Sequence, residues 1–268
     1  MPDITELIKN WWKQVLFVVL LSLLVVGAIT FFQPRQYLSV TTSVPASSFA
    51  SDRSRIFNEN IHALYSTLGT PDDLDMIVGT GNLDTVYLAV ADQFNLFDHY
   101  KMSEKPETAL PKAAAMLKKN TRVMKSEYGE LKVKVWDTDK NLAPQLANTI
   151  MEKLASIHQN LQGAGNEAAL RGLTAGKKQL QGQLDSAGIT AETKNTLLLQ
   201  IQQYEKLIGE YQLMVDSKPP VLVVVEKAKA SAWPDRPKRL QVLIATAVLS
   251  LFFAFLAALL MESRKKAK

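Results

Sequence analysis

The chain lacks cysteine entirely and has only three histidines among its 268 residues. Without cysteine there is neither a disulfide bond nor a thiolate metal site. The histidines, His62, His99 and His158, lie far apart and show none of the spacings typical of metal ligands. We therefore expect no metal site and no bound cofactor, and we interpret each histidine as an ordinary surface or half-buried residue.

Catalytic motifs are lacking as well. The chain contains neither the Gly-x-Ser-x-Gly motif of hydrolases nor the His-Glu-x-x-His motif of zinc proteases. The stretch RGLTAGKK at 171–178 is not a phosphate-binding loop, because three residues separate its glycines and no Ser or Thr follows its lysines. The glycines of Gly79-Thr80-Gly81 are interpreted as the end of a helix. We predict no catalytic residue and a protein that is not an enzyme.

Long hydrophobic runs occur in two places, 15–32 and 240–261. The second, LQVLIATAVLSLFFAFLAALLM, contains no Asp, Glu, Lys or Arg. A helix of about 22 residues, rising ~1.5 Å per residue, covers the ~30 Å hydrocarbon core of a bilayer. The first run follows Trp11 and Trp12, and indoles favour the membrane interface. We interpret it as an uncleaved signal anchor, and both runs as transmembrane helices.

The basic residues around these runs predict the orientation. Lys9 and Lys13 precede the first span and Arg35 follows it, and the first span usually dominates. The second span is followed by Arg264, Lys265, Lys266 and Lys268, but it is preceded by Arg236, Lys238 and Arg239. We predict both termini on the cytoplasmic side, with the intervening chain on the other side. The net charge of +5 arises mostly at the span ends, so we expect no nucleic-acid partner.

Four short stretches have the β-branched composition and the boundaries of strands: 37–44, 121–126, 131–136 and 221–226. Helical periodicity is found at 54–68, after Pro71, at 84–94 and at 106–119, and a turn-like stretch covers 95–102. Alternation in the third strand places Leu131, Val133 and Val135 on a covered face and Lys132, Lys134 and Trp136 on a solvated one. The economical arrangement is one mixed sheet near the membrane with helices packed on it.

The stretch 139–183 has the longest helical periodicity in the chain. It is capped by Thr138 or Asp139, or by Asn141, which would place Pro144 in the first turn. Its inward stripe is formed by Leu142, Leu146, Ile150, Leu154 and Ile157. Beyond Leu161, glycines at 163, 165, 172, 176 and 182 each cost about 1 kcal/mol of helix stability unless close packing uses them.

A second long helix follows a reversal at Gly188. Thr190 is its expected cap, and the helix runs to about residue 215. Its predicted inward residues are Leu197, Leu198, Ile201, Tyr204, Leu207, Ile208 and Tyr211. Together the two helices predict an antiparallel hairpin whose first arm, if continuous, is ~65 Å long.

These elements define an α+β membrane protein. Two terminal transmembrane helices flank a membrane-proximal mixed α/β domain, from which a long antiparallel helical hairpin projects. The predicted parts are a cytoplasmic N-terminus at 1–14, transmembrane helix 1 at 15–32, an α/β base at 33–138, the hairpin at 139–216, a final strand and proline-rich segment at 217–239, transmembrane helix 2 at 240–261 and a cytoplasmic tail at 262–268.

The sequence resembles the chain-length determinant (Wzz-type) polysaccharide co-polymerases of bacterial inner membranes. The resemblance lies in the terminal spans, in the strand after the first span, and in LKVKVWDTDKNLAPQLANTIMEKL at 131–154 with its helix-start pair Ala147-Asn148. It lies also in VLVVVEKAKASAWPDRPKR at 221–239, which is similar to the proline-rich segment before the family's second span. The likeness covers nearly the whole chain.

The resemblance implies a ring-like homo-oligomer in the inner membrane with its bulk in the periplasm. It implies partnership with a Wzy-type polymerase, possible contact with lipid-linked polysaccharide, and control of the chain length of O-antigen or a related polymer. It implies no catalytic residue. The chain is short for the O-antigen members, and its arm is rich in glycine.

Several residues are candidates for particular roles. Pro234 and Pro237 either fix how the sheet is set on the second span or act as a stiff spacer. Lys134 and Trp136 either meet a neighbouring subunit or are covered within the chain. Small residues of the spans allow close helix contact or face lipid: Gly27, Ala28, Ala245, Ala247, Ala254, Ala257 and Ala258.

Two other functions compete with length control. One is a membrane adaptor or activator of a separate cytoplasmic tyrosine kinase in capsule or exopolysaccharide export, for which the short tail without tyrosine offers little docking surface. The other is a sensory receptor, for which we expect that tail to be too short to hold an output domain.

Overall fold

The computed structural model describes residues 4–46, 73–186 and 190–266. The helix predicted at 54–68, the residues Pro71 and Asp72, and the reversal at Gly188 lie outside these ranges. The chain divides into two compact units. One consists of the described parts of 1–38, 137–140 and 231–268, and the other of the described parts of 39–136 and 141–230.

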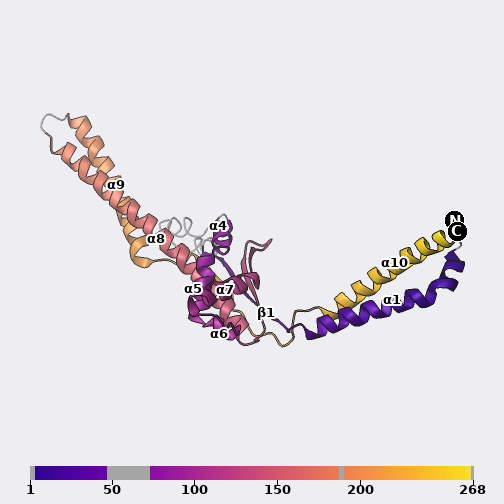
Figure 1. Ribbon diagram of the computed structural model, residues 1–268. Coiled ribbons are helices and arrows are strands. Elements are labelled where there is room, and N and C mark those ends of the chain that lie inside the picture. Colours follow the sequence, from indigo (N-terminus) through magenta and orange to yellow (C-terminus); the bar gives the residue numbers. More distant parts are fainter. Residues whose placement is uncertain (1–3, 47–72, 187–189, 267–268) are drawn as a thin grey trace. The chain divides into compact units, whose positions relative to one another are not determined.

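The first unit is built on a pair of long apolar helices, α1 (Ile4–Phe32) and α10 (Arg239–Lys266), which lie side by side and antiparallel (Figure 1). The stretches long and apolar enough to cross a membrane are Trp11–Phe32 and Arg239–Ser263, with mean hydropathies of 2.9 and 2.7. Only 6% and 17% of these stretches is buried. Such exposure does not suit core helices of a soluble domain, and the helices coincide with the two predicted spans.

Small residues line the contact between α1 and α10. Ala254 and Ala258 are buried there, 6% and 3% exposed, as are the hydroxyl residues Thr30 and Ser250. A Cβ at Gly27 would meet Leu243 Cδ2 at 3.8 Å, an ordinary contact distance. For the small residues we left two alternatives, close helix contact or exposure to lipid. Ala254 and Ala258 make the close helix contact. Three others are exposed: Ala28, Ala245 and Ala257.

Polar contacts join the two helices at both ends of the pair. Near one end the Trp11 indole N–H donates to Glu262 Oε2 at 3.0 Å. At the other end Arg239 Nη2 donates to the carbonyl of Phe31 at 3.3 Å, and its guanidinium lies 5.3 Å from the Phe31 ring centroid. These contacts fix the helices in register along their length.

The second unit contains most of a four-stranded sheet. Its strands are β1 (Tyr37–Pro45), β2 (Thr121–Lys125), β3 (Leu131–Asp137) and β4 (Leu222–Glu226), in the order β2-β3-β1-β4. The first two residues of β1 and the last residue of β3 belong to the first unit. The β2–β3 and β1–β4 pairs are antiparallel. All four predicted strands are confirmed. β1, which follows the first span, pairs with β4, which precedes the second.

Short helices cover the core beside this sheet. They are α4 (Asp73–Thr80), α5 (Asp84–Gln93), α6 (Leu96–His99) and α7 (Pro106–Lys119). The stretch 95–102, predicted as a turn, contains the four-residue α6. The helix predicted at 106–119 is α7, which buries an alanine-rich face formed by Ala109, Ala113 and Ala114. Together with α8 these elements enclose one hydrophobic cluster.

The predicted helical hairpin is formed by α8 (Leu142–Leu184) and α9 (Ala191–Ser217), which pack along each other (Figure 1). Asn141 is the N-cap residue of α8, so the alternative caps at Thr138 and Asp139 were wrong, although no side-chain cap hydrogen bond forms there. At the start of α9 the predicted cap is confirmed, because Thr190 Oγ1 accepts from the Thr193 N–H at 3.3 Å.

The two halves of α8 have different surroundings. The first half is part of the core, and Leu146, Ile150 and Leu154 are fully buried. Beyond His158 no described residue of α8 is buried, and α9 is the element that α8 as a whole contacts most extensively. The glycine-rich half is thus a hairpin arm rather than part of the core.

Close packing in the arm uses one of its glycines. A Cβ at Gly176 would lie 2.6 Å from Tyr204 Cε1, so the tyrosine ring of α9 crosses α8 where there is no side chain. Beside it Lys177 Nζ lies 2.8 Å from Glu205 Oε1. On α9 Leu197 and Ile201 are buried as predicted, but Leu198 and Leu207 are 46% and 40% exposed, so their prediction as inward residues was wrong.

Candidate functional site at the root of the hairpin

The segment that follows β4 is held by polar side chains of β1. Thr41 Oγ1 donates to the carbonyl of Glu226, and Ser39 Oγ donates to that of Lys229, both at 3.0 Å. Ser43, on the same face, donates to the sulfur of Met151 in α8 at 3.2 Å. These three hydroxyl residues are buried, which is acceptable because each has a partner. They position the chain just before it turns toward the second span.

Asn148 of α8 holds the same segment from the other side. Its Oδ1 accepts from the Ala228 N–H at 2.8 Å, and its Nδ2 donates to the Ala228 carbonyl at 3.4 Å. The preceding Ala147 is fully buried in the core. The Ala-Asn pair therefore has two roles: alanine permits close packing of the helix, and asparagine satisfies both backbone groups of one residue in an irregular segment.

We did not infer from the sequence that β1 binds this segment. The signal was present in YLSVTTSVP, where Ser39, Thr41 and Ser43 recur with the period of two that places side chains on one face of a strand. A polar face that is buried needs hydrogen-bond partners. The carbonyl partners of Thr41 and Ser39 lie 185 and 190 residues away in the chain and have no local sequence signal.

The proline-rich segment pairs through its backbone with Gln36, the residue just before β1. The Gln36 N–H donates to the Arg236 carbonyl at 3.0 Å, and the Gln36 carbonyl accepts from the N–H groups of Asp235 and Arg236 at 2.8 and 3.2 Å. Pro234 and Pro237 flank this pairing. Their role in setting the approach to the second span remains a prediction.

Trp136 was predicted on a solvated face, and this was wrong. Its side chain is 9% exposed, and Val135 and Asp137 beside it are buried as well. Cover within the chain, the alternative that we left open, is what the structure has. Lys134 is half-buried, and an oligomer contact at that residue remains a prediction. On the same face Lys132 pairs with Glu130 at 2.8 Å, and this hydrogen bond, with a second from Ser126, lowers the pKa of Glu130.

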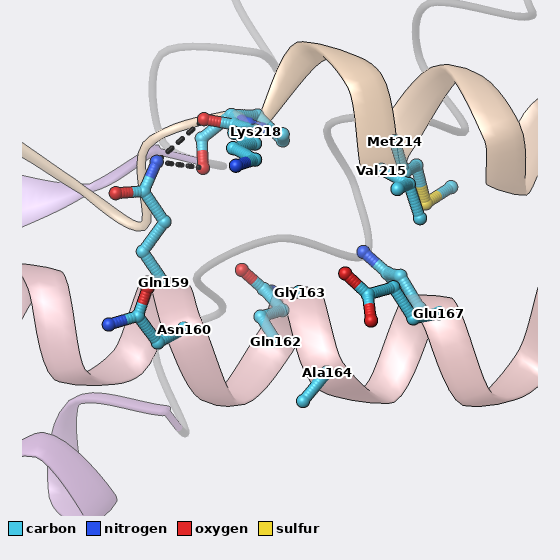
Figure 2. Close-up of a pocket in the computed structure, with 11 residues that line it drawn as sticks. Gln159, Asn160, Gln162, Gly163, Ala164, Glu167, Met214, Val215 and Lys218 are labelled. Carbon is cyan, nitrogen blue, oxygen red and sulfur yellow. Dashed lines mark hydrogen bonds between the residues drawn. The ribbon is translucent and has the colours of Figure 1, made fainter.

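A cleft of about 230 Å³, lined by both polar and apolar side chains, lies at the root of the hairpin between α8 and the end of α9 (Figure 2). The amide of Gln159 crosses to α9 and donates to the carbonyl groups of Lys218 and Pro219, at 2.6 and 3.3 Å. Lys218 has a left-handed backbone with φ of 42° and ends the helix. Further along the cleft the Glu167 carboxylate faces the gap opposite Met214 and Val215 (Figure 2).

The described residues contain no cluster of three His, Cys, Asp or Glu that could hold a metal ion. His158, predicted to be a surface or half-buried residue, is instead 5% exposed, with its Nε2 2.9 Å from Thr80 Oγ1. The glycine-rich stretch 171–178 lies in the middle of α8, where its peptide groups take part in the helix. Its interpretation as something other than a phosphate loop agrees with this position.

The Asn148 contact leads to a stability prediction. We expect Asn148→Ala to lower the free energy of unfolding by about 1–3 kcal/mol, because the backbone groups of Ala228 lose both partners. Asn195→Ala on the exposed face of α9 is the matched control, since both changes alter helix propensity equally. Pulse proteolysis of the full chain in urea measures the difference. Equal effects of the two substitutions would show that the Asn148 hydrogen bonds contribute nothing.

Taken together, fold and site define a protein with two helices long and apolar enough to cross a membrane and an α+β domain that carries a long helical hairpin. No protein-family profile matches the chain, and no curated protein matches it either. Solved structures do. A full-length bacterial polysaccharide co-polymerase is 13% identical, with 99% of this chain and 98% of that one covered and a TM-score of 0.43.

A fragment of WzzB, a polysaccharide co-polymerase from Salmonella Typhimurium, is 12% identical over 75% of this chain and 100% of the fragment, with a TM-score of 0.27. These similar structures are bacterial polysaccharide co-polymerases, the family that the sequence resembles.

Proposed function

We propose that this protein is a non-enzymatic regulator of the chain length of a bacterial surface polysaccharide. It acts as an inner-membrane co-polymerase, together with a Wzy-type polymerase, on O-antigen or a related polymer of the cell surface. It exerts this control through its shape and its contacts, not through bond making or breaking.

The observation that carries the proposal is the contact between Asn148 and Ala228. Each residue lies in one of the two stretches on which the family resemblance rests, 131–154 and 221–239. These stretches are 80 residues apart at the contact, and they meet through two reciprocal hydrogen bonds. Motifs that are individually weak thus form one structural unit, which links the hairpin helix to the segment that leads into the second span.

The membrane arrangement follows from the span pair. The antiparallel pair of apolar helices supports an arrangement in which both ends of the described chain lie on one side of the membrane and the α/β domain and hairpin lie on the other. Lys9 and Lys13 before the first span favour the cytoplasm for the ends. In this arrangement the α/β domain and the hairpin are periplasmic, and the chain enters the domain through β1 and leaves it through β4.

Self-association suits the exposed surface of the arm. Leu161, Leu199 and Leu213 are 54–62% exposed on the hairpin, where neighbouring copies of the chain would cover them. Several copies arranged as a ring around the growing polymer or its polymerase would give a structure that measures length without a catalytic site.

The direct test is the length distribution of surface polysaccharide, separated on a gel, from cells with and without the gene. We expect a cluster of preferred lengths that becomes a random ladder upon deletion and returns upon complementation. Complete loss of polymer would favour the adaptor for a separate kinase in export. An unchanged gel pattern would contradict a role in polymer assembly.

A further inference from the structure

The end of the span pair at which α1 ends and α10 begins has an excess of positive charge. We call Arg35, Arg236, Lys238 and Arg239 the basic collar. One acidic residue, Asp235, accompanies them in sequence. The same compact unit includes 137–140, with two aspartates and one lysine. The charges of these groups still sum to a positive value, and Arg35 and Lys238 are exposed.

The backbone gathers the collar from opposite ends of the chain. The bridge between Gln36 and Arg236, with three hydrogen bonds of 2.8–3.2 Å, brings the residue after Arg35 against the segment 235–239. The Arg239 N–H donates to the Pro237 carbonyl at 2.9 Å, which turns the chain into α10. The collar is therefore a fixed arrangement of charge and not a chance grouping of tails.

Charges of one sign at this position are unfavourable unless something offsets them. α10 begins at Arg239 and has no acidic residue in its first turn. The helix dipole adds partial positive charge at that end. The Arg239 guanidinium itself lies on the Phe31 ring and donates to its carbonyl, so it is held at the collar.

Exposed aromatic residues place the collar at the depth of lipid headgroups. Phe31, Phe32 and Trp233 are 69%, 85% and 81% exposed, beside the ends of the two apolar helices. Aromatic side chains of this kind mark the membrane interface. Basic residues are usually concentrated on the cytoplasmic flank, so the net positive charge that remains at the opposite end favours a ligand of opposite charge.

We propose that the basic collar binds the phosphate of an anionic membrane lipid. The inference rests on the membrane placement given above, and it does not depend on length control. Two lipids present a phosphate at this depth: the phosphatidylglycerol of the surrounding leaflet, and a polyprenyl phosphate of the kind that carries glycans. Both have the same chemistry for the collar, and the experiment distinguishes them.

The test uses the full-length chain in detergent, titrated with one lipid at a time and followed by native mass spectrometry. The probes are phosphatidylglycerol, polyprenyl phosphate and, as the net-neutral lipid, phosphatidylcholine. The variant is Arg35→Gln with Lys238→Gln, which leaves the Arg239 contacts in place. The control is Lys194→Gln with Lys206→Gln on the exposed face of α9, an identical change of charge.

We expect the collar variant to bind anionic lipid roughly 25-fold more weakly than the wild type, at about fivefold for each basic side chain, with the control unchanged. Stronger binding of polyprenyl phosphate than of phosphatidylglycerol would identify the glycan carrier as the ligand. Equal binding of the two lipids would show that the collar recognises the phosphate alone, and the abundant phosphatidylglycerol of the leaflet would then be its ligand. Wild-type affinity in the collar variant, or equal binding of phosphatidylcholine, would overturn the proposal. Polysaccharide gels do not enter this test, so its failure is separate from failure of the proposed function.

Discussion

Replacement of Leu154 by alanine is expected to lower the free energy of unfolding by about 2–5 kcal/mol. Leu154 is fully buried where the first half of α8 packs in the core. The substitution removes apolar contacts and leaves a cavity that its neighbours fill only in part. A loss of this size is a large fraction of the stability of an ordinary domain. Pulse proteolysis of the full chain in urea gives the shift in the unfolding midpoint.

Leu161→Ala on the same helix is the matched control. Leu161 is 61% exposed, two turns further along α8, and the chemical change is identical. We expect its effect to stay within about 0.5 kcal/mol. If both substitutions cost the same, either Leu154 is not in the core or Leu161 is covered by another subunit, and a repeat at low protein concentration separates these two results.

Gly81→Ala is expected to destabilise the protein by about 1–3 kcal/mol through overpacking. Gly81 follows α4, and a Cβ there would lie 2.9–3.0 Å from the side-chain atoms of Val123 in β2. Valine is branched at Cβ, so the side chain cannot rotate away. The Gly81 carbonyl also accepts from the Tyr87 hydroxyl at 2.6 Å, which restrains the loop. Burial raises the pKa of Tyr87 to about 12, so this hydroxyl remains a donor at neutral pH.

Gly79→Ala, two residues away, is expected to stabilise the protein, whereas Gly81→Ala destabilises it. A Cβ at Gly79 would meet no atom within 4 Å, and the residue lies inside α4, so alanine gains up to about 1 kcal/mol of helix propensity. A double-mutant cycle of Gly81→Ala with Val123→Ala isolates the steric contact. A coupling near zero in that cycle would contradict the close approach of Gly81 and Val123.

Local patterns predicted the elements of this fold well. All four strands were recognised from β-branched runs, and the stripe from Leu146 to Leu154 correctly identified the buried face of α8. The prediction for Trp136 failed because an alternating pattern of apolar and polar residues assumes that only one face of the strand is covered. At the end of β3 three successive residues are buried, and that cover comes from elements whose positions the pattern does not contain. Leu198 and Leu207 failed because a helix packed on one partner has room for only part of its apolar residues.

The candidate site was predicted in part. Ala147 and Asn148 were singled out through the resemblance, and Pro234 and Pro237 through their effect on the backbone. Their partners were not, because Ala228 lies 80 residues from Asn148, and Gln36 precedes its partner Arg236 by 200 residues. Hydrogen bonds to backbone groups carry no side-chain signature in the partner. Contacts of this kind require coordinates.

The strand order has a consequence for how the protein is made. β1 pairs with β4, and Thr41 donates to a carbonyl 185 residues further along the chain. During synthesis the edge of β1 that pairs with β4 therefore remains unpaired until the ribosome has reached Glu226. Such distant pairings are slow to form, and an unpaired edge is prone to wrong association. Because only twelve residues separate β4 from α10, closure of the sheet and insertion of that helix are neighbouring steps, so a newly made chain depends on protection of β1 until both have been synthesised.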